Sequence, residues 1–502
     1  MDKRGDGVIN IGWYARDGYL DLYPLISKQL KFDGYPVTSF YACNCTRDTD
    51  HLYENYDIKN AWKLSKYILQ KDWDISDKAI RTIEKKYSSR TLIECLWGDK
   101  FELKLTESEL RKNLVSHFDF WESFVKDLEI EVLVSEHTSI LSTCIAWMVC
   151  KKYNVSFFSF GTVPIKGGRV GIIAEWKGHY EGLGEIIKNN HSIDNQDTLQ
   201  LTKTFLEEIK HSGLKKNETA IFDMDNEEKI SILPRIPSSY FDFNAAMIRR
   251  KKLTEYYLYR KSISEELRDR IKQRFKKFYR LLLINSGLFH QRNSNYNPNK
   301  DRYYFYPIHM SGEWGNYPFM GLNIANQPNL VREIADCLPV GSYLYVKEHT
   351  TGFGNRKKKF YLEIKKHPNI RMINPYEDTI DLIKHCQAVI TLGSTVGFEA
   401  FLLNKPVFYY GEPWYTNFPG MSKVRSSEEL AMLMQNASEF PVATDSQIQK
   451  CVAAIYDVSF EGYLYNPSML KDPENIIRYS KALVEYLKLE KHEGITQKPG
   501  KK

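Results

Sequence analysis

The sequence predicts a two-domain α/β protein in which each domain contains a Rossmann-type, doubly wound parallel sheet. Three observations support this fold class. The length of 502 residues exceeds what one hydrophobic core usually serves. Short apolar runs alternate with helical stretches in both halves of the chain, and polar residues directly follow several of those runs. Two such domains would face each other across a cleft, with extra helices at the junction.

The N-terminal half opens as a βαβ unit, because an apolar run, a helical stretch and a second apolar run follow each other around the Asp33-Gly34 turn. A second unit of the same kind begins near Leu128. The expected strands are Val8 to Tyr14, Val37 to Tyr41, Ile130 to Val134 and Val155 to Phe160, and the expected helices are Leu20 to Lys31 and Ser139 to Lys152.

The C-terminal half shows the clearest alternation of strand and helix. Expected strands are Tyr303 to Pro307, Tyr343 to Val346, Ile370 to Ile373, Ala388 to Leu392 and Val407 to Tyr410. Expected helices lie near 326 to 337, 357 to 366, 378 to 386 and 395 to 403. We therefore expect an N-terminal Rossmann-like domain over 1–245, a basic helical connector over 246–285, a C-terminal Rossmann-like domain over 286–470, and a helix with a basic tail over 471–502.

Composition limits the class of protein and its compartment. Hydrophobic residues make up 42% of the chain, yet no run approaches the roughly 20 apolar residues that cross a bilayer. The longest candidate, Ile140 to Cys150, is too short, and the N-terminus has no apolar signal region. The eight cysteines are scattered, without a pair or Cys/His cluster at zinc spacing. We expect a cytoplasmic protein with reduced thiols and no metal site.

Charge is nearly balanced, with one local exception. The net charge of +7 is mild for this length and suits anionic partners without requiring them, and we expect no nucleic-acid partner. Residues 249–280 contain thirteen Lys or Arg and four acidic residues, with aromatic side chains among them. A basic aromatic helix can lie on an anionic leaflet, which predicts peripheral association with the cytoplasmic face of the inner membrane. The alternative is a solvated helix that connects the two domains.

Polar residues after the C-terminal strands predict a ligand site. His309 follows the first strand, Lys347 and His349 lie at the end of the second, and Ser394 and Thr395 follow the fourth. Ligands of open parallel sheets bind outside the carboxyl ends of the strands, so these side chains should converge on one edge.

The strongest local motif is TLGSTVGFEA, residues 391–400. Gly393 permits a tight exit from the strand, and Ser394 or Thr395 is placed to cap the next helix, whose N-terminal N–H groups favour a phosphate. If Thr395 is the cap, Glu399 comes one residue too late for a capping box and is free to face ribose hydroxyls. The alternative is an ordinary capped helix with an acidic residue near its start.

A second motif, VKEHTTGFGNR, spans residues 346–356. Lys347, His349 and Arg356 can donate hydrogen bonds to a nucleotide phosphate, and the two glycines let the backbone turn closely past it. The alternative is a glycine-rich turn with a solvated histidine.

These motifs, together with YYFYPIHMSGEWG and AVITLGSTVGFEAFLLNKPVFYYGEPWY, resemble the capsule polysaccharide biosynthesis family, which includes the Kdo transferases of capsule assembly. The resemblance spans about 300 to 415, with a thinner match over 129 to 172. It implies a GT-B fold and nucleotide and phosphate contacts from His349, Ser394 and Thr395, with Glu399 nearby. The family usually has His-Pro where this chain has His349-Thr350. The donor therefore stays open among CMP-linked Kdo, another CMP-nonulosonate and a different nucleotide sugar.

Glycosyl transfer also needs a carboxylate at the anomeric centre, as nucleophile for retention or base for inversion. Glu136, just past the strand Ile130 to Val134, is the candidate, and a local structural role is the alternative. Arg169 is the candidate for holding an anionic substrate, against an ordinary surface role.

The sequence thus predicts a glycosyltransferase that adds a sugar to a bacterial capsule or surface polysaccharide. Its expected partners are a nucleotide sugar and a glycan or lipid-linked glycan acceptor, and no cofactor beyond the donor is expected. A nucleotide-sugar 2-epimerase is the alternative enzyme, and a non-catalytic capsule-assembly protein is the alternative from another class.

Overall fold

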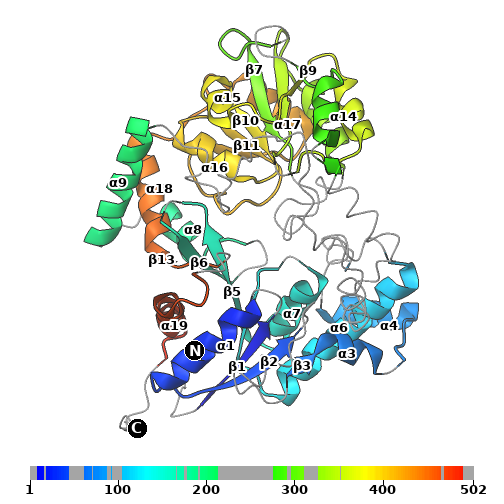
Figure 1. The fold of residues 1–502 in the computed structure, drawn as a ribbon, viewed down its shortest axis with the longest axis vertical. Coiled ribbons are helices and arrows are strands. Elements are labelled where there is room, and N and C mark those ends of the chain that lie inside the picture. Colours follow the sequence, from blue (N-terminus) through cyan, green and yellow to red (C-terminus); the bar gives the residue numbers. More distant parts are fainter. Residues whose placement is uncertain are drawn as a thin grey trace.

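The computed structural model contains two sheets, one in each half of the chain (Figure 1). It describes residues 8–15, 19–43, 61–70, 72–87, 92, 105–138, 140–165, 167–174, 178–189, 193–212, 275–276, 278–290, 296–309, 326–350, 352–464 and 469–489. Most of the predicted connector and the tail after 489 lie outside these residues.

The N-terminal sheet has seven strands in the order β13-β6-β5-β4-β1-β2-β3. Strands β5, β4, β1, β2 and β3 run parallel, and β6 pairs antiparallel with both β5 and β13. The elements are β1 (Ile9–Ala15), α1 (Tyr19–Phe32), β2 (Val37–Cys43), β3 (Trp62–Lys63), α3 (Leu64–Leu69), α4 (Asp77–Tyr87), α6 (Glu107–Asp127), β4 (Val132–Ser135), α7 (Leu141–Lys152), β5 (Ser156–Val163) and β6 (Arg169–Ile173).

The C-terminal sheet has six strands, all parallel, in the order β12-β11-β10-β7-β8-β9. The elements are β7 (Tyr303–Pro307), α13 (Gln327–Asp336), β8 (Tyr343–Lys347), α14 (Lys358–Lys365), β9 (Ile370–Ile373), α15 (Thr379–His385), β10 (Val389–Thr391), α16 (Thr395–Leu402), β11 (Val407–Tyr409), β12 (Met421–Lys423) and α17 (Ser427–Gln435). Each predicted strand is present, and all five residues of β7 are buried, as expected for a strand covered on both faces.

Both sheets contain a point where the strand order reverses. In the C-terminal sheet the chain builds outward from β7 through β8 and β9, then returns to β10 on the other side of β7. In the N-terminal sheet the same reversal lies between β1 and β4. The predicted doubly wound fold is therefore confirmed. Open α/β sheets bind ligands at such switch points, so each sheet offers one candidate site.

The chain ends by returning to the N-terminal sheet. After α18 (Asp445–Asp457), strand β13 (Ser459–Glu461) pairs with β6, and α19 (Pro473–Leu487) packs beside α1 (Figure 1). Tyr479 and Leu483 of α19 share a buried cluster with Leu22 and Ile26 of α1. The expected C-terminal domain, 286–470, was therefore wrong over its last residues, because β13 completes the N-terminal sheet.

The junction between the halves is a packed apolar cluster. Helices α8 (Leu183–Lys188) and α9 (Gln196–Ser212) pack against α18. Tyr180 lies edge-on to Trp414, with ring centroids 5.6 Å apart, and both belong to or pack against one core cluster that also contains Tyr415 and Ile455. The segment that follows β6 and the segment that follows β11 are thus held together by aromatic side chains.

Candidate functional site

A cluster of polar side chains lies at the switch point of the C-terminal sheet. His309 follows β7 and is only 4% exposed, and its Nε2 lies 3.2 Å from Oγ1 of Thr391, the last residue of β10. The Thr391 hydroxyl is also 3.1 Å from Oγ of Ser394. The structure therefore brings together two predicted residues, His309 and Ser394, through a third that the sequence analysis did not select.

Thr391 organises the turn that leaves β10. Its Oγ1 accepts hydrogen bonds from the N–H groups of Gly393 and Ser394, at 3.1 Å each. Gly393 has a φ of 147°, a conformation that side-chain-bearing residues rarely adopt, so glycine is required there. A threonine two residues before a turn glycine is a recognisable local signal, and it could have identified Thr391 from the sequence.

Ser394 is the N-cap of α16, and Thr395 is the first helical residue. The Ser394 side chain makes no capping bond to the helix, since its hydroxyl contacts Thr391 instead. Its carbonyl oxygen accepts a hydrogen bond from the Tyr415 hydroxyl. Tyr415 can approach because Gly397 has no Cβ, which would otherwise lie 2.3 Å from the tyrosine oxygen. The helix end is thus fixed in place without a capping side chain over it.

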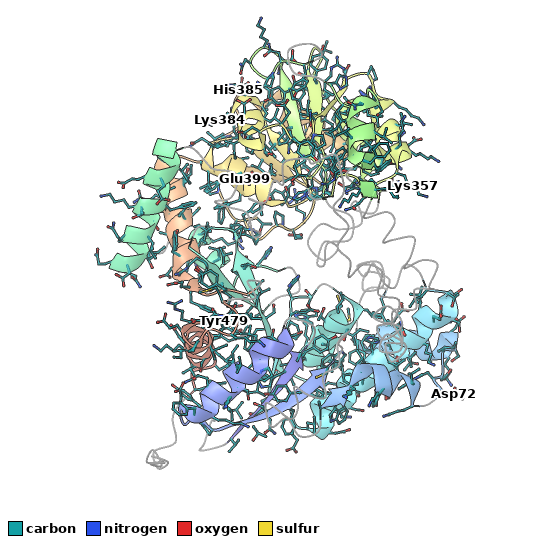
Figure 2. The ribbon with its side chains drawn as sticks, in the orientation of Figure 1. Asp72, Lys357, Lys384, His385, Glu399 and Tyr479 are labelled. Atoms are coloured by element: carbon teal, nitrogen blue, oxygen red, sulfur yellow. The ribbon has the colours of Figure 1, made fainter. Side chains whose placement is uncertain are left out.

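Glu399 lies on α16 and is half-buried (Figure 2). Burial raises the pKa of Tyr415, and the charge of Glu399 raises it further, so these two side chains lie near each other. The prediction that Glu399 stands close to the nucleotide ribose stays a prediction.

Hydrogen bonds from two other side chains hold the backbone of His309 in place. Its N–H donates to Oε1 of Gln327 at 2.8 Å, and its carbonyl oxygen accepts from Nε2 of Gln327 at 2.9 Å. A guanidinium N–H of Arg356 donates to the same carbonyl. Gln327 begins α13, 18 residues from His309, and no local pattern in the sequence indicated this pairing.

The imidazole of His309 is neutral at physiological pH. Burial lowers its pKa to about 3, and the positive charge of Arg356 lowers it in the same direction. A neutral imidazole can donate or accept a hydrogen bond but brings no positive charge to a phosphate.

Arg356 does not have the position expected of a phosphate ligand. Its side chain is 8% exposed, and its Nε forms a 2.9 Å ion pair with Oε2 of Glu348, which is fully buried. The guanidinium also stacks on the Phe360 ring, 4.3 Å from the centroid. Tyr361 donates to the same carboxylate oxygen at 3.0 Å. The structure therefore favours a positioning role for Arg356, because its guanidinium is committed to Glu348 and to the carbonyl of His309.

Lys347 and His349 flank that buried carboxylate. Lys347 ends β8 and is buried, whereas His349 is exposed and its backbone N–H donates to Oε1 of Glu348 at 2.9 Å. The exposed imidazole of His349 can therefore reach a ligand at this edge of the sheet, while Glu348 fixes the backbone that carries it.

Glu136 occupies the corresponding place in the N-terminal sheet. It follows β4 at the switch point and is 4% exposed. The preceding carbonyl, of Ser135, accepts a 2.7 Å hydrogen bond from the Tyr23 hydroxyl of α1. This anchors the strand end from which Glu136 projects.

Arg169 has a structural environment that argues against the predicted role in holding an anionic substrate. Its Nε donates to Oγ of Ser459 at 3.1 Å, and its Nη2 donates to the carbonyl of Tyr456 at 2.8 Å. Its guanidinium also lies 5.4 Å from the Tyr456 ring centroid. Arg169 thus joins β6 to the end of α18 and to β13. These bonds engage guanidinium N–H groups that a substrate anion would need.

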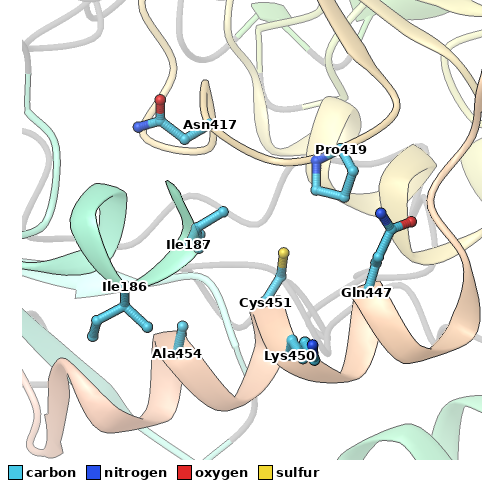
Figure 3. A pocket seen from close by; sticks show the side chains of 8 residues that line it. All are labelled: Ile186, Ile187, Asn417, Pro419, Gln447, Lys450, Cys451 and Ala454. Carbon is cyan, nitrogen blue, oxygen red and sulfur yellow. The ribbon is translucent and has the colours of Figure 1, made fainter. Parts of the chain in front are cut away.

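A pocket of about 230 Å³ lies elsewhere, at the junction of the two halves (Figure 3). It is lined by side chains of α8, α18 and the loop before β12, and none of the predicted site residues is among them. Within the described ranges, no three His, Cys, Asp or Glu side chains gather in a way that could hold a metal ion.

Two α/β sheets, one parallel and one mostly parallel, each with a point where the strand order reverses, define a two-domain protein of the Rossmann-like class. Residues 324–456 match the model of a family described as capsule polysaccharide biosynthesis protein. The match covers α13 to α18 and contains Glu348, Arg356, Thr391 and Ser394. The resemblance expected from the motifs is therefore confirmed in the C-terminal part of the chain.

Solved structures show more distant similarity. Thermosulfurimonas dismutans KpsC, a beta Kdo 2,4 transferase, is 12% identical over 71% of this chain and 87% of its own, with a TM-score of 0.40. The beta Kdo 2,7 transferase of the same KpsC is 12% identical, over 76% of this chain and 98% of its own, with a TM-score of 0.36. Methanocaldococcus jannaschii UDP-GlcNAc 2-epimerase is 13% identical, over 88% of this chain and 98% of its own, with a TM-score of 0.29. Similarity at this level does not establish a shared activity. No curated protein sequence matches the chain.

Proposed function

We propose that this chain is a glycosyltransferase of capsule polysaccharide synthesis that takes its sugar from a nucleotide-activated donor. One observation carries the proposal: the family match over 324–456 contains Thr391 and Ser394, which belong to the polar cluster at the switch point between β7 and β10. The cluster has the chemistry that a nucleotide phosphate requires, and it lies where open parallel sheets bind nucleotides.

In this proposal the donor phosphate binds at the N-terminus of α16. The Ser394 hydroxyl is held by Thr391 and makes no capping bond, so no capping side chain competes with a ligand for the first helical N–H groups. Thr395 adds a hydroxyl at the first helical position. The positive end of the helix dipole and these donors favour a phosphate over a neutral ligand. His309 and the exposed His349 complete the site from β7 and β8.

Transfer requires a second group at the sugar. The bond between the anomeric carbon and the donor phosphate oxygen breaks, and its electron pair leaves with the nucleotide phosphate. An acceptor hydroxyl oxygen forms the new bond to the anomeric carbon, and its proton passes to a carboxylate. We assign that carboxylate to Glu136, the base of an inverting transfer, because it lies at the switch point of the other sheet. In a retaining transfer Glu136 would instead attack the anomeric carbon as the nucleotide phosphate leaves, and the acceptor oxygen would displace Glu136 in a second step, its proton passing to the departed phosphate.

The donor we propose first is CMP-linked Kdo or another CMP-nonulosonate, with a glycan or lipid-linked glycan as acceptor. This choice rests on the resemblance of the motifs to a family that includes the Kdo transferases of capsule assembly. The transfer is proposed to need no metal ion, since the helix N-terminus supplies the positive field at the leaving phosphate.

Thermal shift against CMP, UDP and GDP tests the nucleotide class. A hundredfold excess of ligand over its dissociation constant stabilises a protein by about 2.7 kcal/mol, so the cognate nucleotide should be distinguishable. Incubation of CMP-Kdo with a capsule-type acceptor should then release CMP only when acceptor is present, with and without a chelator. Epimerisation of UDP-GlcNAc without acceptor would replace this proposal by the epimerase alternative.

A further inference from the structure

A helical segment beside the C-terminal domain exposes an apolar face. Residues 275–276 and 278–285 are helical, and the segment is anchored from one side. Leu283 is buried in the core cluster, and Arg280 donates from Nε to the carbonyl of Phe353 at 2.7 Å. The Tyr279 hydroxyl donates to the carbonyl of Arg356 at 3.2 Å. These contacts fix which side of the helix faces the domain.

The other side presents four large apolar side chains to solvent, Phe275, Phe278, Leu281 and Leu282. They are between 38% and 60% exposed. Single exposed apolar residues are ordinary on protein surfaces, but four within about two helical turns form a contiguous patch. Because one side of the helix is fixed to the domain, the apolar side chains on the other side face solvent without any movement of the helix.

Exposed lysines adjoin this patch. Lys357, Lys358 and Lys359 begin α14 and are all exposed, and Leu362 on the same helix is 45% exposed (Figure 2 labels Lys357). Two contacts show that α14 and the segment before it lie alongside the 275–285 helix. A Cβ on Gly354 would lie 2.8 Å from Arg280 Cγ, and Lys365 Nζ donates to the carbonyl of Gly287 at 2.6 Å.

Helix α14 contains a single acidic residue. The acidic residue of α14 is Glu363, which pairs with Lys366 at 2.7 Å and with Arg332 at 3.7 Å. Lys357, Lys358 and Lys359 therefore present positive charge next to the apolar side chains. Exposed aromatic and aliphatic groups flanked by lysines are the composition of helices that lie in the headgroup region of a bilayer.

We propose that Phe275, Phe278, Leu281 and Leu282, together with the lysines at the start of α14, form a docking site for an anionic membrane surface. The apolar side chains enter the boundary between headgroups and acyl chains, and the three lysines contact anionic headgroups. Among the described residues, no helix is long and apolar enough to cross a bilayer. The site differs from the basic stretch 249–280 expected from the sequence, of which only 275–276 and 278–280 lie within the described residues. It does not depend on the identity of the sugar donor.

Vesicle sedimentation with the full chain tests the site directly. The probes are vesicles of phosphatidylcholine alone and of phosphatidylcholine with about one third phosphatidylglycerol, each at low and at physiological salt. We expect the protein to sediment with the anionic vesicles, to stay in the supernatant with neutral ones, and to lose binding as salt is raised. Wild-type protein that stays in the supernatant with anionic vesicles at low salt overturns the proposal.

Two variants and two matched controls locate the contact. Lysine contributions of about 1 kcal/mol each predict that the triple change Lys357→Glu, Lys358→Glu and Lys359→Glu weakens vesicle binding roughly a hundredfold. The control reverses three exposed basic residues of α4, through Lys78→Glu, Arg81→Glu and Lys85→Glu. Phe278→Ser with Leu282→Ser should also weaken binding, against a control of Val340→Ser with Met432→Ser, two exposed apolar residues elsewhere.

The pattern across these variants decides the outcome. Loss of binding in both test variants and not in the controls supports the site, provided that thermal unfolding shows each variant to be folded. Equal loss in the α4 control would show that overall charge alone drives adsorption, which overturns the assigned surface. Unchanged binding of Phe278→Ser with Leu282→Ser would show that no apolar insertion occurs and would leave a soluble acidic partner as the better occupant.

Discussion

The Nε2 of His309 and the Oγ1 of Thr391 lie 3.2 Å apart, although 82 residues separate them in the sequence. This contact joins the carboxyl ends of β7 and β10 at the reversal of strand order. Because Thr391 also holds the Ser394 hydroxyl, the position of the helix end depends on a residue that need not touch the nucleotide.

Replacing Thr391 by Val should weaken nucleotide binding and lower stability. The variant keeps the shape of the side chain but leaves the N–H groups of Gly393 and Ser394 without their acceptor. A buried group left unsatisfied costs about 1–3 kcal/mol, so we expect a loss of that order in urea unfolding. Thr391→Ser keeps the hydroxyl and should retain most of the stability and affinity. Equal behaviour of the Val and Ser variants would contradict the assigned role.

The double change Ser394→Ala with Thr395→Ala should weaken nucleotide binding while leaving the fold intact. Hydrogen bonds to charged groups contribute about 1.5–3 kcal/mol each, so isothermal titration should show at least a tenfold loss of affinity. Ser426→Ala is the matched control, because Ser426 caps α17 through a bond to the Glu429 N–H. The control should lose stability but no affinity. Wild-type affinity in the double variant would contradict the proposal that the phosphate binds at the N-terminus of α16.

The strands of the C-terminal domain could be predicted closely because they are short, continuous and buried on both faces. The strands predicted at Tyr303 to Pro307 and Ile370 to Ile373 coincide with β7 and β9, since apolar runs bounded by turn residues fix both ends. Strand β13 was not expected. Its three residues show no alternation of their own, and it forms because β6 offers an unpaired edge.

The positions of the site residues could be predicted from the sequence better than the directions and contacts of their side chains. Residues after strand ends converge, as with His309 and Ser394, because parallel topology brings those ends together. Side-chain direction depends on packing that a sequence motif does not reveal. Arg356 turns inward to the buried carboxylate of Glu348, and Arg169 turns toward β13, although both had the charge that a substrate site would use.

Removing the Arg356 side chain should destabilise the C-terminal domain strongly. Glu348 is fully buried, and burial raises its pKa, whereas the guanidinium opposes that shift. Arg356→Ala would leave this carboxyl without its cation, and breaking a buried ion pair typically costs about 3–5 kcal/mol. Arg425→Ala, which breaks an exposed pair with Glu429, should cost less than about 1 kcal/mol. Similar losses in urea unfolding for the two variants would argue against the inward role of Arg356.

Stability should fall in mild acid, in part because of His309. Its pKa is about 3 in the folded protein, well below the value of about 6.5 in an unfolded chain. Between these values the unfolded chain binds a proton that the folded protein excludes, so the stabilisation present above pH 6.5 is lost as pH falls toward 3. Buried His117, with a pKa of about 4, acts in the same sense.

The change His309→Gln should remove part of this pH dependence. Each such histidine accounts for about 2 kcal/mol between pH 6.5 and pH 5, so the variant should lose less stability than wild type over that interval in urea unfolding. His385→Gln is the control, because His385 lies on the surface at the end of α15. An identical loss for wild type and His309→Gln would show that His309 takes up its proton in the folded state.

The last prediction separates nucleotide binding from transfer. Glu136→Gln should abolish sugar transfer and leave nucleotide affinity unchanged, because the carboxylate acts on the sugar while the phosphate is held at α16. The substitution is nearly isosteric, so the anchoring bond from Tyr23 to Ser135 should persist and thermal unfolding should change little. Glu131→Gln is a matched control, since Glu131 lies at the start of β4, and its carboxylate accepts from the Asn10 N–H at 3.0 Å. Rates of CMP release with acceptor present, measured beside calorimetric nucleotide titrations, give both quantities. Full transfer by Glu136→Gln would assign the proton acceptor to another N-terminal acid, whereas loss of nucleotide binding would place Glu136 in the donor site itself.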